Sequence, residues 1–246
     1  MKINYFIINP GGNITAIVCG KFTKKIKLKI TKNILKINPT AEQVGFWTNT
    51  KNKNLDAKLE MAGGEFCGNA LRSLGALLTY AGNNKSNFII KSSGMKTPVK
   101  INSSEKFSSI TINLELLKYK NNICSIPGIK YFLSEKKFTK LSAKSELAKK
   151  NLLINKASGV ISYEKINEKT YKISPIVYVR DTETLYSESA CASGTLALAY
   201  MSYIKTGMKK MYVRQPSGSI FETVIGNEKI ELSGPILGIE KKMMLA

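Results

Sequence analysis

One short pattern occurs twice in this 246-residue chain, and it constrains the fold more than any other feature. Each copy has a cysteine, a small residue, a polar residue and a second small residue, followed by an apolar run. The copies begin at Cys67 and Cys191, 124 residues apart, and the same offset relates Ser93-Gly94 to Ser217-Gly218. Two matching units at a fixed offset indicate an internal duplication. The alternative is a coincidence between two small-residue helix starts, since short motifs match easily.

The apolar spacing after each cysteine predicts a buried helix. Leucines recur at helical spacing over residues 68–80, and residues 192–205 are apolar almost all round. Strand-like runs flank both helices, and Gly75 inside the first predicts close packing against a sheet. We predict an α/β (α+β) fold of two pseudo-symmetric halves, each a curved, mostly antiparallel sheet or barrel around a central helix. The halves are residues 1–116 and 117–246, and the last strand is able to cross back to the first half.

The chain contains no histidine, which limits the catalytic and metal-binding sites that it can form. It excludes Ser-His-Asp triads, Cys-His proteolysis and zinc sites with histidine ligands. The four cysteines form no Cys-x-x-Cys pair, and we predict no metal site. Acid–base chemistry near neutral pH then falls to Cys, Asp, Glu, Lys or Tyr. A cysteine at a helix N-terminus is a suitable group, because the unpaired N–H groups and the macrodipole there lower a thiol pKa.

The net charge of +21 raises the alternative of a basic nucleic-acid-binding protein. Only three of the 38 basic residues are arginine, the side chain that nucleic-acid recognition uses for bidentate contacts, and the lysines are scattered. We therefore expect solvated lysine faces and no nucleic-acid partner. Residues 1–20 do not resemble a signal peptide, and the longest apolar run is too short to span a bilayer. These features predict a cytoplasmic protein with no membrane partner.

Two helix-start cysteines permit a specific reaction if the halves face each other. Cys67 and Cys191 then meet across a cleft, and both helix N-termini are directed into it. A ligand carboxylate accepts N–H bonds from Gly68-Asn69 and from residues 192–194. One thiolate removes a proton from the ligand Cα while the opposite thiol donates one to the other face, which inverts the stereocentre. The reaction needs no metal and no organic cofactor.

Four segments together carry a family resemblance. Residues 9–13, 67–70, 191–195 and 216–218 resemble the N-terminal Gly-Asn turn, the two catalytic cysteine motifs and the late Pro-Gly-Gly turn of one enzyme family. These are the cofactor-independent amino-acid racemases and epimerases of the diaminopimelate epimerase fold. Diaminopimelate epimerase itself remains an alternative function. However, it carries an arginine shortly before the second cysteine, where this chain has Tyr-Ser-Glu-Ser-Ala at residues 186–190.

A closer resemblance is to the histidine racemases of this family, through residues 42–46, 64–70, 188–191 and 215–220. It implies racemisation of a small amino-acid substrate, L-histidine or D-histidine, by Cys67 and Cys191 as the acid–base pair, and a homodimer is a possible assembly. The resemblance also implies contacts to the ligand backbone from Asn13, Gly68, Asn69, Ser193 and Gly194. Two carboxylates are further candidates, Glu42 as the imidazole partner and Glu188 beside the second cysteine. Ala192 replaces the glycine of the family and adds a methyl group near the expected carboxylate.

Overall fold

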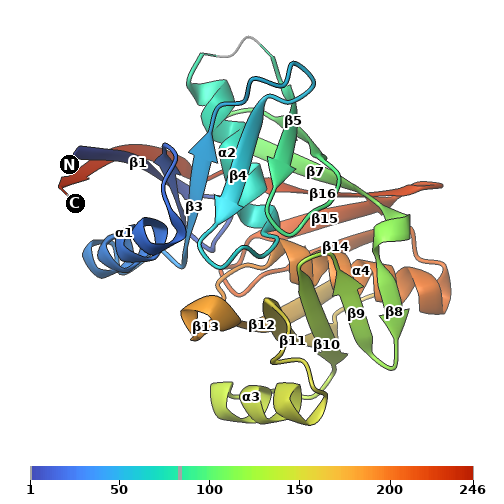
Figure 1. The fold of residues 1–246 in the computed structure, drawn as a ribbon. Coiled ribbons are helices and arrows are strands. Elements are labelled where there is room, and N and C mark those ends of the chain that lie inside the picture. Colours follow the sequence, from blue (N-terminus) through green and yellow to red (C-terminus); the bar gives the residue numbers. More distant parts are fainter. Residues whose placement is uncertain (1, 83–84, 246) are drawn as a thin grey trace.

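The computed structural model describes residues 2–82 and 85–245, and shows a mixed α+β fold (Figure 1). The described part of the chain contains four α-helices: α1 (Lys24–Ile37), α2 (Gly68–Tyr80), α3 (Lys140–Lys149) and α4 (Ala192–Thr206). It also contains two short 3-10 helices, η1 (Leu114–Leu116) and η2 (Arg180–Thr182). Both helices predicted after the cysteines are confirmed, because α2 and α4 begin at the residue that follows Cys67 and Cys191.

Seventeen strands form one continuous sheet in the described chain. In the first part of the sequence they are β1 (Lys2–Asn9), β2 (Thr15–Cys19), β3 (Gln43–Thr48), β4 (Ala57–Met61), β5 (Asn87–Ser92), β6 (Val99–Ser103) and β7 (Phe107–Asn113). The next are β8 (Lys118–Lys120), β9 (Ile123–Ile126), β10 (Ile129–Ser134), β11 (Ala157–Lys165) and β12 (Thr170–Val179). The last are β13 (Thr184–Ser187), β14 (Lys210–Arg214), β15 (Ile220–Ile225), β16 (Lys229–Pro235) and β17 (Gly238–Leu245).

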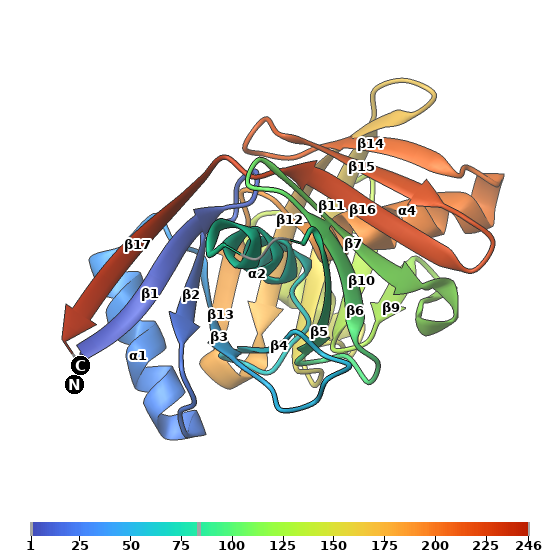
Figure 2. The same cartoon turned by 90° about the horizontal axis from the view of Figure 1, so that it is seen from above.

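The sheet is mostly antiparallel, as predicted. The parallel pairs are β2–β3, β4–β5, β10–β11 and β12–β14. The sheet bends around the two buried helices, so that α2 packs against β2, β6 and β7 while α4 packs against β9, β10, β15 and β16 (Figures 1 and 2). A Cβ added at Gly75 would lie 2.6 Å from Ile101 Cγ2, which confirms the close packing predicted for that helix position.

Two strand pairings join the early and late parts of the chain. β7 pairs antiparallel with β16, and the final strand β17 pairs along the whole of β1, from Lys2 opposite Leu245 to Asn9 opposite Gly238. Figure 2 shows β17 beside β1 at the edge of the molecule. In the described residues no helix has the length and apolar character needed to cross a membrane.

A buried arginine lies where these parts of the sheet meet. The Arg72 side chain on α2 is fully buried, and its guanidinium donates to the carbonyl oxygens of Ser108, Pro10 and Pro235, each at 2.9 Å. The guanidinium also lies 4.5 Å from the ring centroid of Phe221. Burial lowers the pKa of Arg72 to about 9. Because these groups come from distant segments, one side chain fixes α2 to the turn after β1, to β7 and to the end of β16.

The two Ser-Gly turns of the duplicated pattern occupy comparable positions. Ser93 Oγ donates to the carbonyl oxygen of Glu65 at 2.7 Å, and Ser217 N donates to the carbonyl oxygen of Ser189 at 2.8 Å. Each turn therefore holds the segment that leads into a cysteine. A Cβ at Gly94 would lie 2.5 Å from the backbone nitrogen of Phe66, so this approach requires glycine.

Candidate active site

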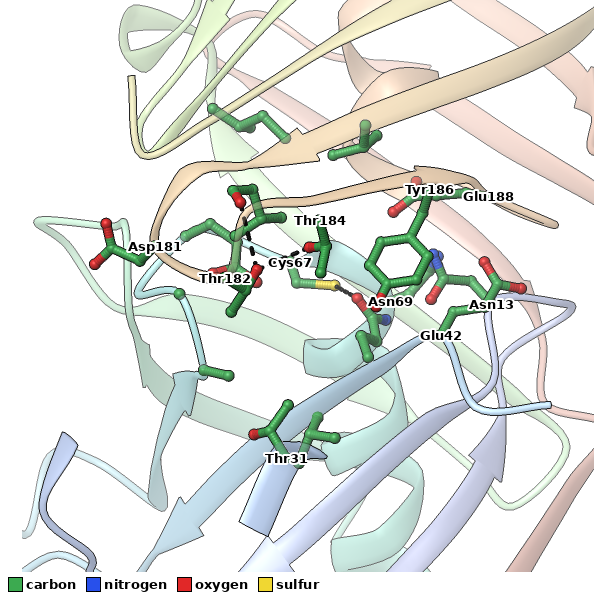
Figure 3. Close-up of a pocket in the computed structure, with 18 of the residues that line it drawn as sticks. Asn13, Thr31, Glu42, Cys67, Asn69, Asp181, Thr182, Thr184, Tyr186 and Glu188 are labelled. Carbon is green, nitrogen blue, oxygen red and sulfur yellow. Dashed lines mark hydrogen bonds between the residues drawn. The ribbon is translucent and has the colours of Figure 1, made fainter. Parts of the chain in front are cut away.

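A cavity of about 680 Å³ lies at the N-termini of α2 and α4. Its wall also includes one side of α1, the start of β3 and the segment from η2 through β13. Both Cys67 and Cys191 line it, so the structure brings the two predicted thiols to one space. Figure 3 shows Cys67 and Asn69 near the centre of this cavity, with Glu42, Glu188 and Tyr186 gathered on one side.

Cys67 is the N-cap residue of α2. Its Sγ accepts the backbone N–H of Ala70 at 3.3 Å, as a helix cap does, and donates to Gln43 Oε1 at 2.9 Å. Burial raises the pKa of the Cys67 thiol to about 12, and the charges of Glu188 and Glu65 act in the same direction, while the Ala70 N–H opposes them.

Cys191 has the same position on α4. Its Sγ accepts the Gly194 N–H at 3.2 Å and lies 3.4 Å from the Tyr131 hydroxyl oxygen. Its backbone N–H donates to Gln215 Oε1 at 2.9 Å. Burial and the neighbouring Glu188 carboxylate raise the pKa of the Cys191 thiol well above its usual value, although the bonds from Tyr131 and Gly194 lower it in part.

The sequence-based expectation of lowered thiol pKa values is therefore wrong. The N–H bonds from Ala70 and Gly194 act in the expected direction. They are outweighed by burial, which removes water from a charged sulfur, and by carboxylates placed nearby. The pKa of each thiol is therefore raised above its usual value.

The predicted carboxylates lie at one end of the cavity. Glu42 accepts the Ser189 N–H at 3.1 Å and also the Ser189 hydroxyl, and burial raises its pKa. Burial raises the pKa of Glu188 to about 8, the charge of Glu42 adds to this rise, and bonds with Cys191 and Asn13 reduce it. This end of the cavity is acidic, although the chain as a whole is strongly basic.

The predicted asparagines line the cavity beside these carboxylates. Asn13 has a φ of +51°, as a turn residue at a hairpin tip can. The side-chain N–H groups of Asn13 and Asn69 both donate to the carbonyl oxygen of Ala190, at 2.9 and 3.0 Å. They therefore hold the residue that precedes Cys191. Within the described chain, Asn13 Oδ1 is buried and lacks a protein partner, which leaves it available to a ligand N–H.

The residues after the second cysteine divide into two groups. Ala192 and Ser193 line the cavity, as does Gly68 after the first cysteine, whereas Gly194 does not. Its N–H donates to the sulfur of Cys191, the N-cap residue of α4, at 3.2 Å, and its predicted contact with the ligand stays a prediction. A Cβ on Gly68 would lie 2.8 Å from Ala192 Cβ, so the methyl group that departs from the family pattern fills the space between the two helix starts.

Several cavity residues were not found from the sequence. They are Gln43, Glu65, Tyr131 and Tyr186, together with Gln215 behind Cys191. Gln43 and Gln215 stand 24 residues before Cys67 and 24 after Cys191, inside two of the family-like segments, and that placement is a usable signal. Burial raises the pKa of Glu65 to about 7, and its Oε2 is buried without a partner among the described residues.

Comparisons with known proteins identify relatives of this chain. A family model described as "Histidine racemase CntK N-terminal domain" matches residues 2–233. The chain is 32% identical to a histidine racemase of Fusobacterium nucleatum, over 95% of this chain and 94% of that protein. It is 25% identical to a histidine racemase of Staphylococcus aureus, over 90% of this chain and 88% of that protein.

Solved structures share the fold at low sequence identity. A hydroxyproline epimerase from Agrobacterium vitis superposes with a TM-score of 0.68 at 12% identity, covering 98% of this chain and 91% of that one. A PhzC/PhzF-type protein from Clostridium difficile superposes with a TM-score of 0.67 at 12% identity, covering 99% of this chain and 100% of that one. These structures extend the fold comparison beyond the sequence relatives.

Proposed function

Because this chain belongs to the histidine racemase family, we propose that it interconverts L-histidine and D-histidine, with Cys67 and Cys191 as its acid–base pair. It is an isomerase of the amino-acid racemase class. One observation carries the mechanism: two thiols, each at the N-terminus of its own helix, line the same cavity. Such a pair can act on opposite faces of one carbon atom.

The helix N-termini suit the carboxylate of an amino acid. The first N–H groups of α2 and α4 have no partner within their helices, and they favour negative charge. We assign the substrate carboxylate to these groups, between Gly68-Asn69 and Ala192-Ser193. They also stabilise the charge that develops when the Cα proton leaves. The Asn13 Oδ1 atom, buried and unpartnered in the described chain, is the acceptor for the substrate amino group.

Proton transfer then needs one thiolate and one thiol. Glu188 lies beside Cys191, and its ionised form, which gains population as the pH approaches its pKa of about 8, can accept a proton from that sulfur. In one direction the Cα–H bond breaks as an S–H bond forms on one cysteine. The S–H bond of the other cysteine breaks as the new C–H bond forms on the opposite face. The reverse direction exchanges the two roles.

The acidic end of the cavity suits an imidazole. Glu42 is a half-buried carboxylate that can accept an imidazole N–H, and the Tyr186 ring lies beside it (Figure 3). Diaminopimelate would need a group for its distal carboxylate. Arg180 lines the cavity, but it donates to the Ile154 carbonyl oxygen at 2.7 Å and forms an ion pair with Asp181. Because the Arg180 guanidinium is already bonded to these two residues, it is not free to bind a distal carboxylate, and histidine is favoured over diaminopimelate as the substrate.

We also propose that the fold consists of two facing halves of the diaminopimelate epimerase type, residues 1–116 and 117–246. The comparable Ser-Gly turns and helix-start cysteines support this division. The pairing of β17 with β1 means that the end of the second half completes the first.

The test is exchange of the Cα proton in heavy water, followed by NMR together with chiral analysis of the product. Reduced protein is incubated with L-histidine, meso-diaminopimelate and other L-amino acids. We expect histidine to lose its Cα proton signal and to yield the D-enantiomer. Exchange of a different amino acid would keep the thiol pair and remove Glu42 as an imidazole partner. No exchange with any of them, from folded and reduced protein, would contradict the proposal.

A second experiment addresses Glu42 directly. The Glu42→Gln variant keeps the shape of the side chain but loses the charge that strengthens a hydrogen bond to imidazole. We expect KM for histidine to rise by about tenfold or more, with a smaller change in kcat. The matched control is Glu183→Gln, which removes an exposed carboxylate at the rim of the same cavity. Equal effects of both variants would point to the general charge of the cavity instead of Glu42.

A further inference from the structure

The two thiols differ in whether a side-chain hydroxyl group reaches the sulfur. Cys67 Sγ faces an amide oxygen, Gln43 Oε1, at 2.9 Å. Cys191 Sγ faces a hydroxyl group, that of Tyr131, at 3.4 Å. An amide oxygen only accepts a hydrogen bond, whereas a phenol can donate one. Cys191 also interacts with the Glu188 carboxylate, which accepts. Tyr131 is therefore a side-chain donor that Cys191 has and Cys67 lacks, although their helix caps are alike.

The orientation of the Gln43 amide follows from its other bond. Gln43 Nε2 donates to Thr15 Oγ1 at 2.7 Å, and Thr15 Oγ1 in turn donates to the carbonyl oxygen of Asn13 at 3.0 Å. The threonine hydroxyl has used its one hydrogen, so it accepts from the amide nitrogen. A reversed amide would offer an N–H to the sulfur and favour the thiolate. In the observed orientation the oxygen faces Cys67 and favours an S–H group there.

The Tyr131 hydroxyl is held just as firmly. Tyr131 is fully buried on β10, and its hydroxyl oxygen lies 2.6 Å from Ser193 Oγ. When Ser193 donates in this short bond, the phenolic hydrogen is free to be directed at Cys191 Sγ. The Gly194 N–H reaches the same sulfur at 3.2 Å. Two donors converging on one sulfur favour a thiolate.

The sheet leaves the tyrosine ring little freedom to move. Tyr131 on β10 is the register partner of Gly159 on β11. A Cβ at Gly159 would lie 2.7 Å from Cε1 and 2.9 Å from Cδ1 of the ring, so the ring occupies the space that a side chain would need. The hydroxyl position is thereby set by backbone pairing as well as by its own hydrogen bonds.

We propose that Tyr131 is a positioning residue that stabilises Cys191 as a thiolate, while Gln43 retains the proton on Cys67. The reaction then starts with Cys191 as the base and Cys67 as the acid. This inference rests on the proposed racemase function and deepens it. The enantiomer whose Cα–H faces Cys191 reacts first, and the two sulfurs must afterwards exchange protons before the same enantiomer reacts again.

Other titratable groups face these sulfurs and are part of the expected pH response. Glu188 lies beside Cys191 and also acts on Cys67. Glu65 acts on Cys67, and both Glu42 and Glu65 act on Glu188. These carboxylates disfavour a thiolate at either position. In the proposal, the difference between Gln43 at Cys67 and Tyr131 at Cys191 decides which of the two sulfurs is the thiolate.

The first test measures thiolate formation without substrate. Iodoacetamide alkylation of each cysteine is followed by mass spectrometry as a function of pH. We expect Cys191 to react at a lower pH than Cys67. In Tyr131→Phe the pH of half-maximal reaction of Cys191 should rise by about one unit, the loss of one hydrogen bond to a charged sulfur, and that of Cys67 should not change. Ultraviolet thiolate absorbance of a protein in which Cys19, Cys67 and Cys124 are replaced by Ala, with and without Tyr131→Phe, follows Cys191 without any need for reagent access.

The matched control is Tyr171→Phe, a buried tyrosine of β12 outside the cavity lining, which should leave both cysteines as in the unsubstituted protein. Two results would overturn the proposal: a Cys67 thiolate that forms at lower pH than the Cys191 thiolate, or a Tyr131→Phe shift that is absent or equal at both sulfurs. These outcomes do not depend on the identity of the substrate.

The second test uses hydrogen exchange in heavy water with both histidine enantiomers. Of the two cavity thiols, Cys67→Ala retains Cys191 and Cys191→Ala retains Cys67, so each variant should exchange the Cα hydrogen of one enantiomer without inversion. Adding Tyr131→Phe should slow exchange in the Cys67→Ala protein about tenfold and leave the Cys191→Ala protein unchanged. Equal slowing in both would overturn the assignment. Failure of the unsubstituted enzyme to exchange histidine would refute the proposed function, while the thiolate measurements would still decide the role of Tyr131.

Discussion

Cys67 and Cys191 have the same backbone conformation and the same helix-cap bond, but their burial and their side-chain partners differ. Both cysteines are N-caps with extended backbone, at φ −135° and ψ 108° for Cys67 and φ −137° and ψ 100° for Cys191. Each sulfur accepts the N–H three residues later. Yet Cys67 is half-buried against an amide oxygen, whereas Cys191 is 2% exposed beside a hydroxyl and a carboxylate. The repeated motif determines where each sulfur lies, and the strands around it determine what that sulfur can do.

Removing either sulfur is the strongest test of whether the two sites act as a pair. Cys67→Ala and Cys191→Ala should each lower the racemisation rate by about 10²- to 10⁴-fold, because each removes one of the two proton-transfer groups. The rate is measured by circular dichroism or chiral chromatography. Cys19→Ala is the control, since Cys19 is a half-buried cysteine of β2 outside the cavity. Full activity in either the Cys67→Ala or the Cys191→Ala variant would show that the two thiols do not act as a pair.

The contact between the two helix starts allows a test with a built-in rescue. Gly68→Ala places a Cβ 2.8 Å from Ala192 Cβ, which should push the two cysteine helices apart and lower kcat/KM by about 10²-fold. Ala192→Gly removes that methyl group and should restore most of the loss in the double variant, with little effect alone. Gly226→Ala is the control, because a Cβ added there would lie 3.9 Å from the nearest atom, the Lys229 carbonyl oxygen. Additive effects of the two substitutions would mean that the helix starts are not coupled.

The smallest effect concerns stability and pH. Glu188 and Glu65 have pKa values of about 8 and 7 in the folded protein, above the ordinary value of 4.5. The folded chain therefore retains protons that the unfolded chain has already lost. The free energy of unfolding should fall as the pH rises from about 5 to 8. In Glu188→Gln this fall should be shallower, as measured by urea unfolding at a series of pH values. An unchanged slope would show that Glu188 does not carry a raised pKa.

The positions of the two thiols could be predicted from the sequence because the signals are local. A cysteine before a small-residue helix start, leucines at helical spacing and Gly75 all report on one helix at a time. These signals remain valid whatever surrounds them, and the structure confirms both helices and the close packing at Gly75.

The partners of the sulfurs could not be predicted, because they depend on strand register. Tyr131 approaches Cys191 from a strand 60 residues away, and a one-residue shift of β10 would turn its side chain to the opposite face. The sequence predicted lowered thiol pKa values, and that direction was wrong for a related reason. The helix effect is a property of the motif, whereas burial and the carboxylate of Glu188 come from the assembled fold.

Because β1 pairs with β17, the two ends of the described chain lie side by side, and the fold does not depend on where along the chain its ends are placed. Lys2 and Leu245 are register partners, so a short linker could join the two ends of the described chain. New ends could be opened in the exposed loop at residues 135–137, between β10 and α3. Such a circular permutant would retain α2, α4 and every strand pairing. Its two cysteines would then occur in the opposite order along the chain, around an unaltered cavity.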